Sequence, residues 1–348
     1  MIMIADNILI FRCFISLFFS FFLSLILVHR IIPILRNVQQ SGQPIRTLGP
    51  ETHFSKAGTP TMGGVIIIFS VSLSTIIFAD LSNPYIWISL FVLLSFSMLG
   101  FLDDYKKITK NNHIGITPKV KLFFQLAVSM IAILLTNHYF NSDLSTKLSI
   151  PFFKHYLLEI SYLYFPFAMI VITGSSNAVN LTDGVDGLAS STIAIATLAF
   201  AIIAYIASSP FGASSLNIIY TPLTTEMTIL CSAIIGSCLG FLWFNSNPAE
   251  IFMGDTSSLS LGAMLGIISI MTKQELLLVI IGGIFVIETL SVIIQVYYFK
   301  KTAGKRFFLM TPIHHHFEKK GWTESKVLVR FCIISFLLAL LGLFSIIC

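Results

Sequence analysis

Stretches of about 20 mostly apolar residues follow one another along most of this chain, and they constrain its fold more than any other feature. The ten stretches are centred near Phe19, Phe69, Phe91, Val128, Ala168, Leu198, Ala233, Leu265, Val286 and Leu337. Only 11% of the 348 residues are charged and 55% are hydrophobic, so too little polar surface exists to cover a soluble globule. A bilayer must therefore be the solvent.

These stretches predict helices, because backbone polar groups in lipid must be satisfied within each segment and the alternating pattern of outer-membrane strands is missing. The predicted fold class is an all-α integral membrane protein with about ten transmembrane helices, and we expect residues 1–348 to form a single polytopic domain. Arg30 and Arg36 follow the first stretch in place of a small-residue cleavage site, so we expect this helix to be retained.

Successive loops between helices lie on alternate sides of the membrane, and the basic residues are unevenly divided between these two sides. Sixteen of the 21 Lys and Arg residues follow the first, third and ninth stretches, whereas the opposite loops hold Lys147, Lys154 and Lys273. Because positive loops stay inside, we expect this basic face to be cytoplasmic and both termini to be periplasmic. Five polar motifs fall on the same face, which predicts an active site there.

Two adjacent carboxylates, Asp103 and Asp104, end the third stretch, where the helix macrodipole disfavours anions. Facing a polar cleft, such a pair can hold a divalent cation or share a proton, with Lys106 and Lys107 neutralising the excess charge. A plain interfacial charge cluster at a helix end is the alternative.

Asn177, Asn180, Asp183 and Asp186 follow one another at three-residue intervals, so they share a face wherever the backbone is helical. Amides and carboxylates together suit the hydrogen bonds of a nucleobase, a ribose or hydrated Mg²⁺. For Asp186, the alternative is that it caps the N-terminus of the following helix.

Asp255 precedes the apolar run around Leu265, so capping of that helix competes with a functional role. Asn245, Asn247 and Phe252 in the same loop place amides and an aromatic ring beside this carboxylate.

Three consecutive histidines, His314, His315 and His316, follow Pro312. We expect an extended segment, in which the first and third side chains point together and the second points away. Charged imidazole can neutralise phosphate oxygens, and neutral imidazole can accept a proton. A solvated polar loop is the alternative.

The ninth stretch contains Glu288 and Gln295 on about the same helical face, with Ser291 between them. A carboxylate inside a membrane is costly and indicates function by default, but an interhelical hydrogen bond to Ser or Thr explains Glu288 equally well. A transporter is the rival class; carriers, however, place coupling residues near the midplane, and only Glu288 is deep in this sequence.

Acids, amides, lysines and histidines on one membrane boundary together predict an enzyme site for a phosphate-rich polar substrate and Mg²⁺. Zinc is possible with the histidines, although it typically takes a tighter ligand set. A lipid co-substrate could reach such a site sideways from the bilayer.

The same motifs resemble those of the polyprenyl-phosphate N-acetylhexosamine-1-phosphate transferase superfamily, and within it the phospho-N-acetylmuramoyl-pentapeptide transferase family. The matching segments are KAGTPTMGG from Lys56, FLDDYKK ending at Lys107, NAVNLTDGVDGLA from Asn177, GFLWFNSNPAEIFMGD ending at Asp255 and PIHHHFEKKGW from Pro312. The first and last of these resemble this family more than relatives that use UDP-N-acetylglucosamine, which are the nearer rival. Ser257 and Cys332 depart from the Gly and Trp that are usual there.

The resemblance implies transfer of phospho-MurNAc-pentapeptide from UDP-MurNAc-pentapeptide to undecaprenyl phosphate at the bacterial inner membrane, giving lipid I and UMP. It implies that Asp255 binds Mg²⁺ and that Asp103 and Asp104 take part in the phosphate chemistry. We expect Asp103 and Asp104 to be further metal ligands. We expect these three residues and His314 to be catalytic. We expect substrate to contact Lys56, Lys107, Lys119, Asn177, Asn180, Asp183, Asp186, Asn245, Phe252, Gln295, His315 and His316.

The family resemblance further implies a homodimer and a ninth helix that bends to open a lipid groove. The sequence leaves two chemical forms open. The lipid phosphate attacks the nucleotide directly, with Asp103 helping to deprotonate it, or a carboxylate first forms a phospho-enzyme.

Overall fold

The computed structural model describes residues 2–39, 58–110, 115–140, 143–153 and 156–347, and Lys56 lies outside these ranges. The described helices are α1 (Ile2–Val38), α2 (Gly64–Phe78), α3 (Pro84–Thr109), α4 (Pro118–Tyr139), α5 (Tyr164–Thr182), α6 (Leu188–Ser208), α7 (Pro210–Ser215), α8 (Met227–Asn245), α9 (Asp255–Met271), α10 (Leu277–Ile281), α11 (Gly283–Lys301), α12 (Ile313–Lys319) and α13 (Glu324–Ile347). A short antiparallel pair, β1 (Lys147–Ser149) and β2 (Leu157–Glu159), joins α4 to α5.

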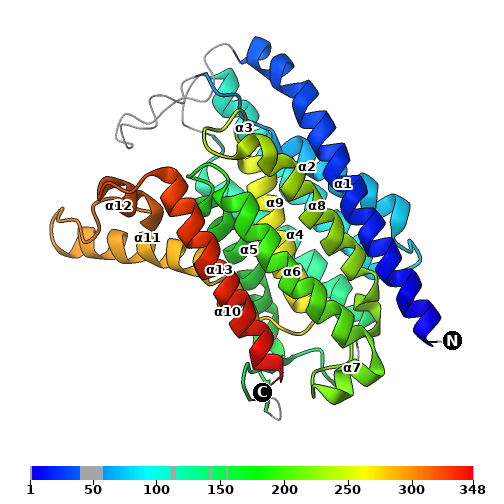
Figure 1. Cartoon of the computed structure of the whole chain (residues 1–348). Helices are drawn as coiled ribbons and strands as arrows, with labels where there is room; N and C mark the ends of the chain where they lie inside the picture. Colours follow the sequence, from blue (N-terminus) through cyan, green and yellow to red (C-terminus); the bar gives the residue numbers. More distant parts are fainter. Residues whose placement is uncertain (1, 40–57, 111–114, 141–142, 154–155, 348) are drawn as a thin grey trace.

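The predicted all-α membrane fold is confirmed, because each of the ten predicted centres lies inside a helix. Among the described residues, eight helices are long and apolar enough to cross a membrane, and α2 and α9 are shorter apolar helices. Figure 1 shows these helices packed side by side in one bundle. Both termini lie toward its lower end, as an even number of crossings requires, and the sidedness of the membrane stays a prediction.

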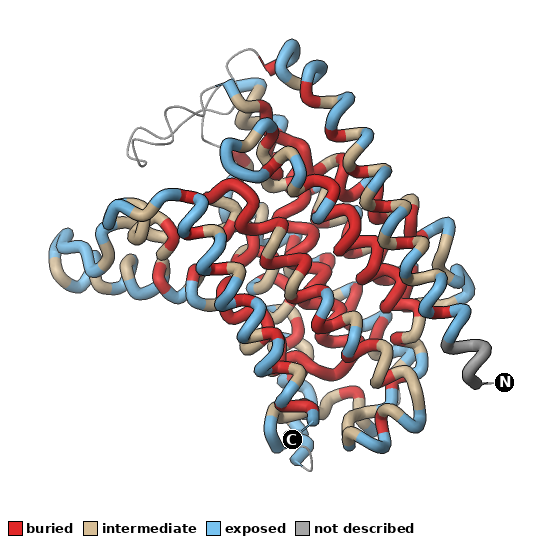
Figure 2. The backbone as a smooth tube through the Cα atoms, in the orientation of Figure 1, coloured by how far each residue is buried: buried red, intermediate tan, exposed pale blue. Residues whose placement is uncertain are grey.

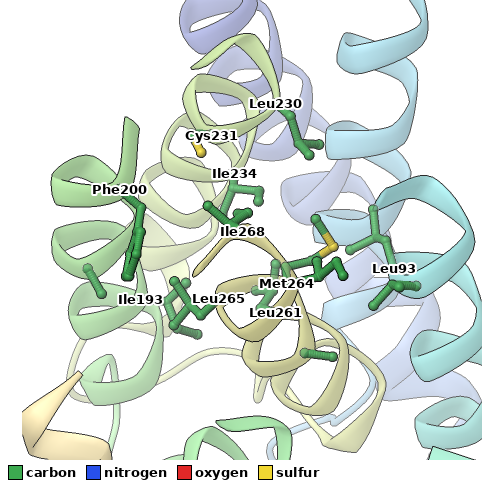
Figure 3. Packing of buried hydrophobic residues seen from close by; sticks show 14 of the residues in the cluster. Leu93, Ile193, Phe200, Leu230, Cys231, Ile234, Leu261, Met264, Leu265 and Ile268 are labelled. Atoms are coloured by element: carbon green, nitrogen blue, oxygen red, sulfur yellow. The ribbon is translucent and has the colours of Figure 1, made fainter. Parts of the chain in front are cut away.

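The short helix α9 forms the centre of the bundle, and every residue from Thr256 to Met271 is buried. Figure 2 shows buried backbone concentrated in this central region. In Figure 3 the side chains of α9 lie among those of α3, α6 and α8; the labelled residues are Leu93, Ile193, Phe200, Leu230, Cys231, Ile234, Leu261, Met264, Leu265 and Ile268. Because neighbouring helices surround α9, it need not match the full thickness of the bilayer.

Helices α1 and α8 are joined by a row of serines spaced one helical turn apart. The hydroxyls of Ser16, Ser20 and Ser24 donate to α8 carbonyls of residues 229, 233 and 237, at 3.1, 2.8 and 3.1 Å. Gly236 permits this approach, since a Cβ there would overlap the Leu17 carbonyl oxygen on α1. Small residues and interhelical hydrogen bonds drive helix association where lipid provides no hydrophobic force between helices.

The stretch around Val286 is divided at Gly282 into α10 and α11, so the ninth predicted helix is interrupted. Figure 1 shows α11 and α12 projecting to the left of the bundle. We call this projecting pair, α11 with α12, the arm. The arm contacts the rest of the protein through Phe285, which belongs to the main core, and through a small second core made by Val185, Leu188, Ile284, Val327 and Phe331.

We predict that Gly236→Ala separates α1 from α8, because the added methyl group overlaps the α1 backbone. Overpacking of this kind costs about 1–3 kcal/mol, and loss of the serine hydrogen bonds adds to it. The free energy of unfolding in detergent measures the effect.

Gly174→Ala on α5 is the matched control, because a Cβ at Gly174 meets nothing within 4 Å. Alanine is the better helix former, so this variant is expected to be unchanged or stabilised by up to about 1 kcal/mol. Equal destabilisation of both variants would contradict close packing of α1 on α8.

Candidate active site

Asp103 and Asp104 lie inside α3, which continues to Thr109, so the expectation that they end the helix is wrong. The longer helix buries both residues, leaving them 3% and 4% exposed. Adjacent helical positions diverge by about 100°, so the two carboxylates face different partners. Asp103 accepts from the Ile116 backbone N–H at 2.6 Å and pairs with Lys107 at 2.6 Å.

Asp104 binds the N-terminus of α9. Its Oδ1 accepts from the Asp255 N–H at 3.2 Å, and its Oδ2 accepts from the N–H and the hydroxyl of Thr256 at 3.0 and 2.9 Å. The first N–H groups of any helix lack acceptors within that helix. Here the acceptor is a carboxylate from another helix. Asp104 therefore fixes where α9 begins.

Asp255 is the first residue of α9, and the residue before it, Gly254, has a φ of 77° and makes no side-chain cap. The capping alternative for Asp255 is therefore wrong, because Asp104 occupies that role. The Asp255 side chain is directed to cations and an amide instead. Its Oδ2 accepts from Lys107 at 3.0 Å and Lys121 at 3.1 Å, and its Oδ1 accepts from Asn180 at 2.7 Å.

Asp103, Asp104 and Asp255 form an acidic cluster in which one oxygen of each lies within 4.8 Å of the others. Three carboxyl groups face two lysines in this part of the described chain, so the acidic groups outnumber the basic ones. Carboxylate oxygens are the ligands that Mg²⁺ prefers. The residues present therefore fit a divalent cation.

Lys121 is the cation of this cluster that sequence reasoning missed. We expected Lys119 to bind substrate, but Lys119 is exposed in the first turn of α4, and Lys121 reaches Asp255. The sequence offered both lysines after Pro118, and which of them faces α9 depends on the rotation of α4. No local pattern fixes that rotation.

Asn180 and Asp183 approach the acidic cluster, whereas Asn177 does not contact it. Asn180 also donates to Ser258 at 2.9 Å, and Asn177 donates to Gln125 at 2.9 Å and to the Thr173 carbonyl at 2.7 Å. Asp183 follows the end of α5, and its carboxylate accepts from the Gly254 backbone N–H. Burial and the charges of Asp255 and Asp104 raise the pKa of Asp183 well above its ordinary value.

The shared helical face predicted for Asp183 and Asp186 is not formed, because α5 ends at Thr182 and α6 begins at Leu188. Asp186 turns toward the α8–α9 loop, where it accepts from the Asn247 amide at 3.0 Å and the Ala249 N–H at 3.1 Å. Gly187, with a φ of 75°, is the residue before α6, so the capping alternative for Asp186 is also wrong.

Asn245 holds the same loop. Its Oδ1 accepts from the Gly187 N–H at 3.1 Å, and its Nδ2 donates to the Ile251 carbonyl at 2.9 Å. Phe252 follows, and its backbone N–H and carbonyl pair with Pro60 and Gly63 at 2.9 and 3.0 Å. The loop that carries Phe252 is thus attached both to α6 and to the segment before α2.

The three histidines lie in helix α12 and not in the extended segment that we expected. Pro312 directly precedes this helix, a position that proline tolerates, and successive helical side chains diverge. His314 is fully buried, with Nδ1 3.1 Å from Glu288 Oε1. His315 lies 2.6 Å from Glu318, and His316 accepts from the Leu309 N–H at 3.1 Å, so the first and third do not point together.

The polar residues of α11 also have partners within the arm. Glu288, for which function and an interhelical bond to Ser or Thr were equal alternatives, faces His314. Gln295 accepts from the backbone N–H groups of Phe307 and Phe308 at 3.1 and 2.9 Å. Gln295 thereby orders the connection between α11 and α12.

The comparisons with known proteins agree with this geometry. Residues 86–273 match the model of glycosyl transferase family 4, and residues 56–68 match signature 1 of the phospho-N-acetylmuramoyl-pentapeptide-transferases. Proteins named phospho-N-acetylmuramoyl-pentapeptide-transferase from Rickettsia felis, Rickettsia akari and Rickettsia bellii are each 55% identical over 335 residues, which cover 96% of this chain and 92% of each relative.

The membrane bundle and its acidic cluster thus define an integral membrane glycosyl transferase of family 4. Within that class, this chain belongs to the phospho-N-acetylmuramoyl-pentapeptide-transferase family. It is a multi-pass protein of the bacterial inner membrane.

Ser257 departs from the family's usual glycine, and the structure shows what the extra side chain meets. Its hydroxyl is buried without a hydrogen-bond partner among the described residues, and it lies against Gly64 of α2. An unsatisfied buried hydroxyl costs about 1–3 kcal/mol. We predict that Ser257→Ala leaves the free energy of unfolding unchanged or raises it.

Ser260→Ala, three residues further along α9, is the control for Ser257→Ala. The Ser260 hydroxyl donates to the Thr256 carbonyl at 2.9 Å, so its removal is expected to destabilise the protein by about 1 kcal/mol. Chemical denaturation of both variants compares them, and a larger loss for Ser257→Ala would disprove the assignment of an unsatisfied hydroxyl.

Proposed function

We propose that this protein transfers phospho-MurNAc-pentapeptide from UDP-MurNAc-pentapeptide to undecaprenyl phosphate, forming lipid I and UMP. The observation that carries the proposal is the acidic cluster with its two lysines at one end of the membrane bundle, in a chain of this family. A site at this boundary suits one polar, phosphorylated substrate and one lipid substrate. We propose that residues 1–348 act as one domain and that the working form is a homodimer.

Mg²⁺ is the proposed cofactor, held by Asp255 together with Asp103 and Asp104. Asp255 is the principal ligand in this proposal because its side chain is 16% exposed, whereas that of Asp103 is 4% exposed. When bound, the cation would neutralise charge on the transferring phosphate groups.

Lys107 and Lys121 are the proposed phosphate-binding cations. Both ammonium groups lie within 3.1 Å of the same oxygen, Asp255 Oδ2, so the two positive charges are already gathered at one point. Phosphate oxygens that arrive there take up these N–H donors. Fixed cations stabilise the charge of a phosphoryl group in transfer.

We propose the direct form of the reaction. Asp103 accepts a proton from the lipid phosphate, an oxygen of the lipid phosphate bonds to the β-phosphorus of UDP-MurNAc-pentapeptide, and the bond from that phosphorus to the bridging oxygen breaks to release UMP. All six carboxylate oxygens of the acidic cluster already have a hydrogen-bond or ion-pair partner. A phospho-enzyme needs a carboxylate oxygen to leave its partners and bond to phosphorus, whereas proton transfer to Asp103 requires only that Lys107 moves from Asp103 to the arriving phosphate. The direct form therefore disturbs fewer of these contacts.

Asn180 and Asp183 are the proposed nucleotide contacts, because they border the acidic cluster. On α4 we propose Lys121 in place of Lys119, because Lys121 reaches Asp255. The remaining substrate contacts stay predictions from sequence, namely Lys56, Asn177, Asp186, Asn245, Phe252, Gln295, His315 and His316.

A reconstituted assay tests the proposed function. Purified protein with undecaprenyl phosphate and UDP-MurNAc-pentapeptide is expected to release UMP and form lipid I, which mass spectrometry of the lipid identifies. Chelation with EDTA is expected to stop UMP release, and added Mg²⁺ is expected to restore it.

Two further arms of the assay decide the alternatives. UDP-N-acetylglucosamine should give no lipid product, and a product from it alone would favour the sister transferase. Without lipid phosphate, labelled UMP should not exchange into UDP-MurNAc-pentapeptide; exchange would support the phospho-enzyme.

Lys121→Ala is predicted to lower the rate of UMP release by about 10²-fold, since it removes one of two cations from Asp255. Lys119→Ala is the matched control on the same helix turn, and it is expected to stay within about twofold because its side chain is exposed. Initial rates of UMP release at saturating substrate measure both. The reverse order would show that α4 presents Lys119, and not Lys121, to the substrate.

A further inference from the structure

A buried pair formed by Glu288 and His314 lies outside the acidic cluster, where the arm meets the bundle. Both side chains are 0% exposed, and Nδ1 of His314 lies 3.1 Å from Oε1 of Glu288. The second carboxylate oxygen accepts from the His314 backbone N–H at 3.5 Å. One carboxylate on α11 therefore faces both the ring and the backbone of the first turn of α12.

The other edge of the His314 ring lies against the turn between α5 and α6. A Cβ on Gly184 would overlap the ring atom Nε2, so only glycine permits this contact. Neither Nε2 nor Nδ1 makes a hydrogen bond among the described residues, so the approach of Nδ1 to Glu288 is a close polar contact without hydrogen-bond geometry. The ring thus reaches the bundle by packing on the backbone of the turn, with no water-exposed edge.

The turn that His314 touches also carries Asp183 next to Gly184. Asp183 accepts from the N–H of Gly254, the residue directly before Asp255, so the turn is bonded to the start of α9. A continuous series of contacts therefore runs from Glu288 through His314 and Gly184 to Asp183, and so to the acidic cluster.

Apolar contacts alone do not fix the arm in one orientation. The second core joins Ile284 of α11 to Val185 of the turn and to α13, with Ile313 and Phe317 of α12 packed against it. Hydrophobic burial is non-directional, whereas a buried polar pair specifies one arrangement. The Glu288–His314 pair fixes the place of the His314 ring within the arm, and the ring in turn packs on Gly184 of the bundle.

We propose that Glu288 is a positioning residue which, through His314, holds the 183–187 turn so that Asp183 stays beside Asp255. His314 in this proposal acts on the turn from behind and does not touch the substrate. This proposal rests on the proposed function for one point, that the ligand beside the turn is a nucleotide.

The experiment uses the full-length protein in lipid nanodiscs and two readouts, hydrogen exchange of the 183–187 amides and the affinity for UMP. In Glu288→Ala, the turn amides should exchange about tenfold faster and UMP should bind about tenfold more weakly. Glu288→Gln keeps an acceptor for the His314 backbone N–H and should restore most of both properties. Gly184→Ala displaces the ring from its other side and should reproduce the Glu288→Ala result, which provides a second route if Glu288→Ala does not fold.

Glu275→Gln is the matched control, because this carboxylate is equally buried but lies between α9 and α10 with Lys273 and Tyr164 as partners. It should leave turn exchange and UMP affinity unchanged even if it lowers global stability. Unchanged exchange in Glu288→Ala and Gly184→Ala would overturn the proposal, and so would equal acceleration in Glu275→Gln. If the wild-type protein failed to bind UMP, the proposed function would fail, while the exchange measurement would still decide the positioning role.

Discussion

The hydrogen bonds from Asp104 to the start of α9 are the contacts on which the rest of the site depends. The N-terminus of α9 lies inside the protein, where water cannot satisfy its first N–H groups, and Asp104 accepts from two of them and from the Thr256 hydroxyl. Because the carboxylate that serves α9 comes from α3, the two helices are held in register at this point. Gly100 on α3 completes the contact, since a Cβ there would overlap the Asp255 carbonyl oxygen.

This arrangement separates the roles of three carboxylates that look alike in sequence. Asp104 neutralises the helix end, so Asp255 is released from capping and its side chain faces Lys107, Lys121 and Asn180. Asp103, next to Asp104 in the sequence, binds the loop before α4 through the Ile116 N–H. The same loop leads into α4 and so to Lys121. A few polar contacts between distant segments thus determine both the charge and the shape of the site.

Features with a local physical cause could be predicted from the sequence. Apolar length predicted all ten helix centres, and the alternation of the connections placed Asp103, Asp104 and Asp255 on one face of the membrane, where the structure brings them together. Features that depend on helix rotation or on distant partners could not be predicted. Lys121 was overlooked beside Lys119, and the histidines were expected in an extended segment, because their conformation depends on contacts with α11 that the local sequence does not encode. The serines of α1 had no visible partner until α8 was placed against them.

Motif residues divide into those whose polar atoms are engaged by the protein and those that face the acidic cluster. Asn245 uses its amide on the Gly187 N–H and the Ile251 carbonyl, and Asp186 accepts from Asn247 and Ala249. Loss of activity on substitution of Asn245 would therefore follow from movement of the α8–α9 loop even without any contact to substrate. Similarity to a family does not distinguish the two kinds of residue, since a displaced loop and a missing ligand both reduce activity. Only the hydrogen-bond partners of each side chain distinguish a residue that builds the site from one that is available to the reaction.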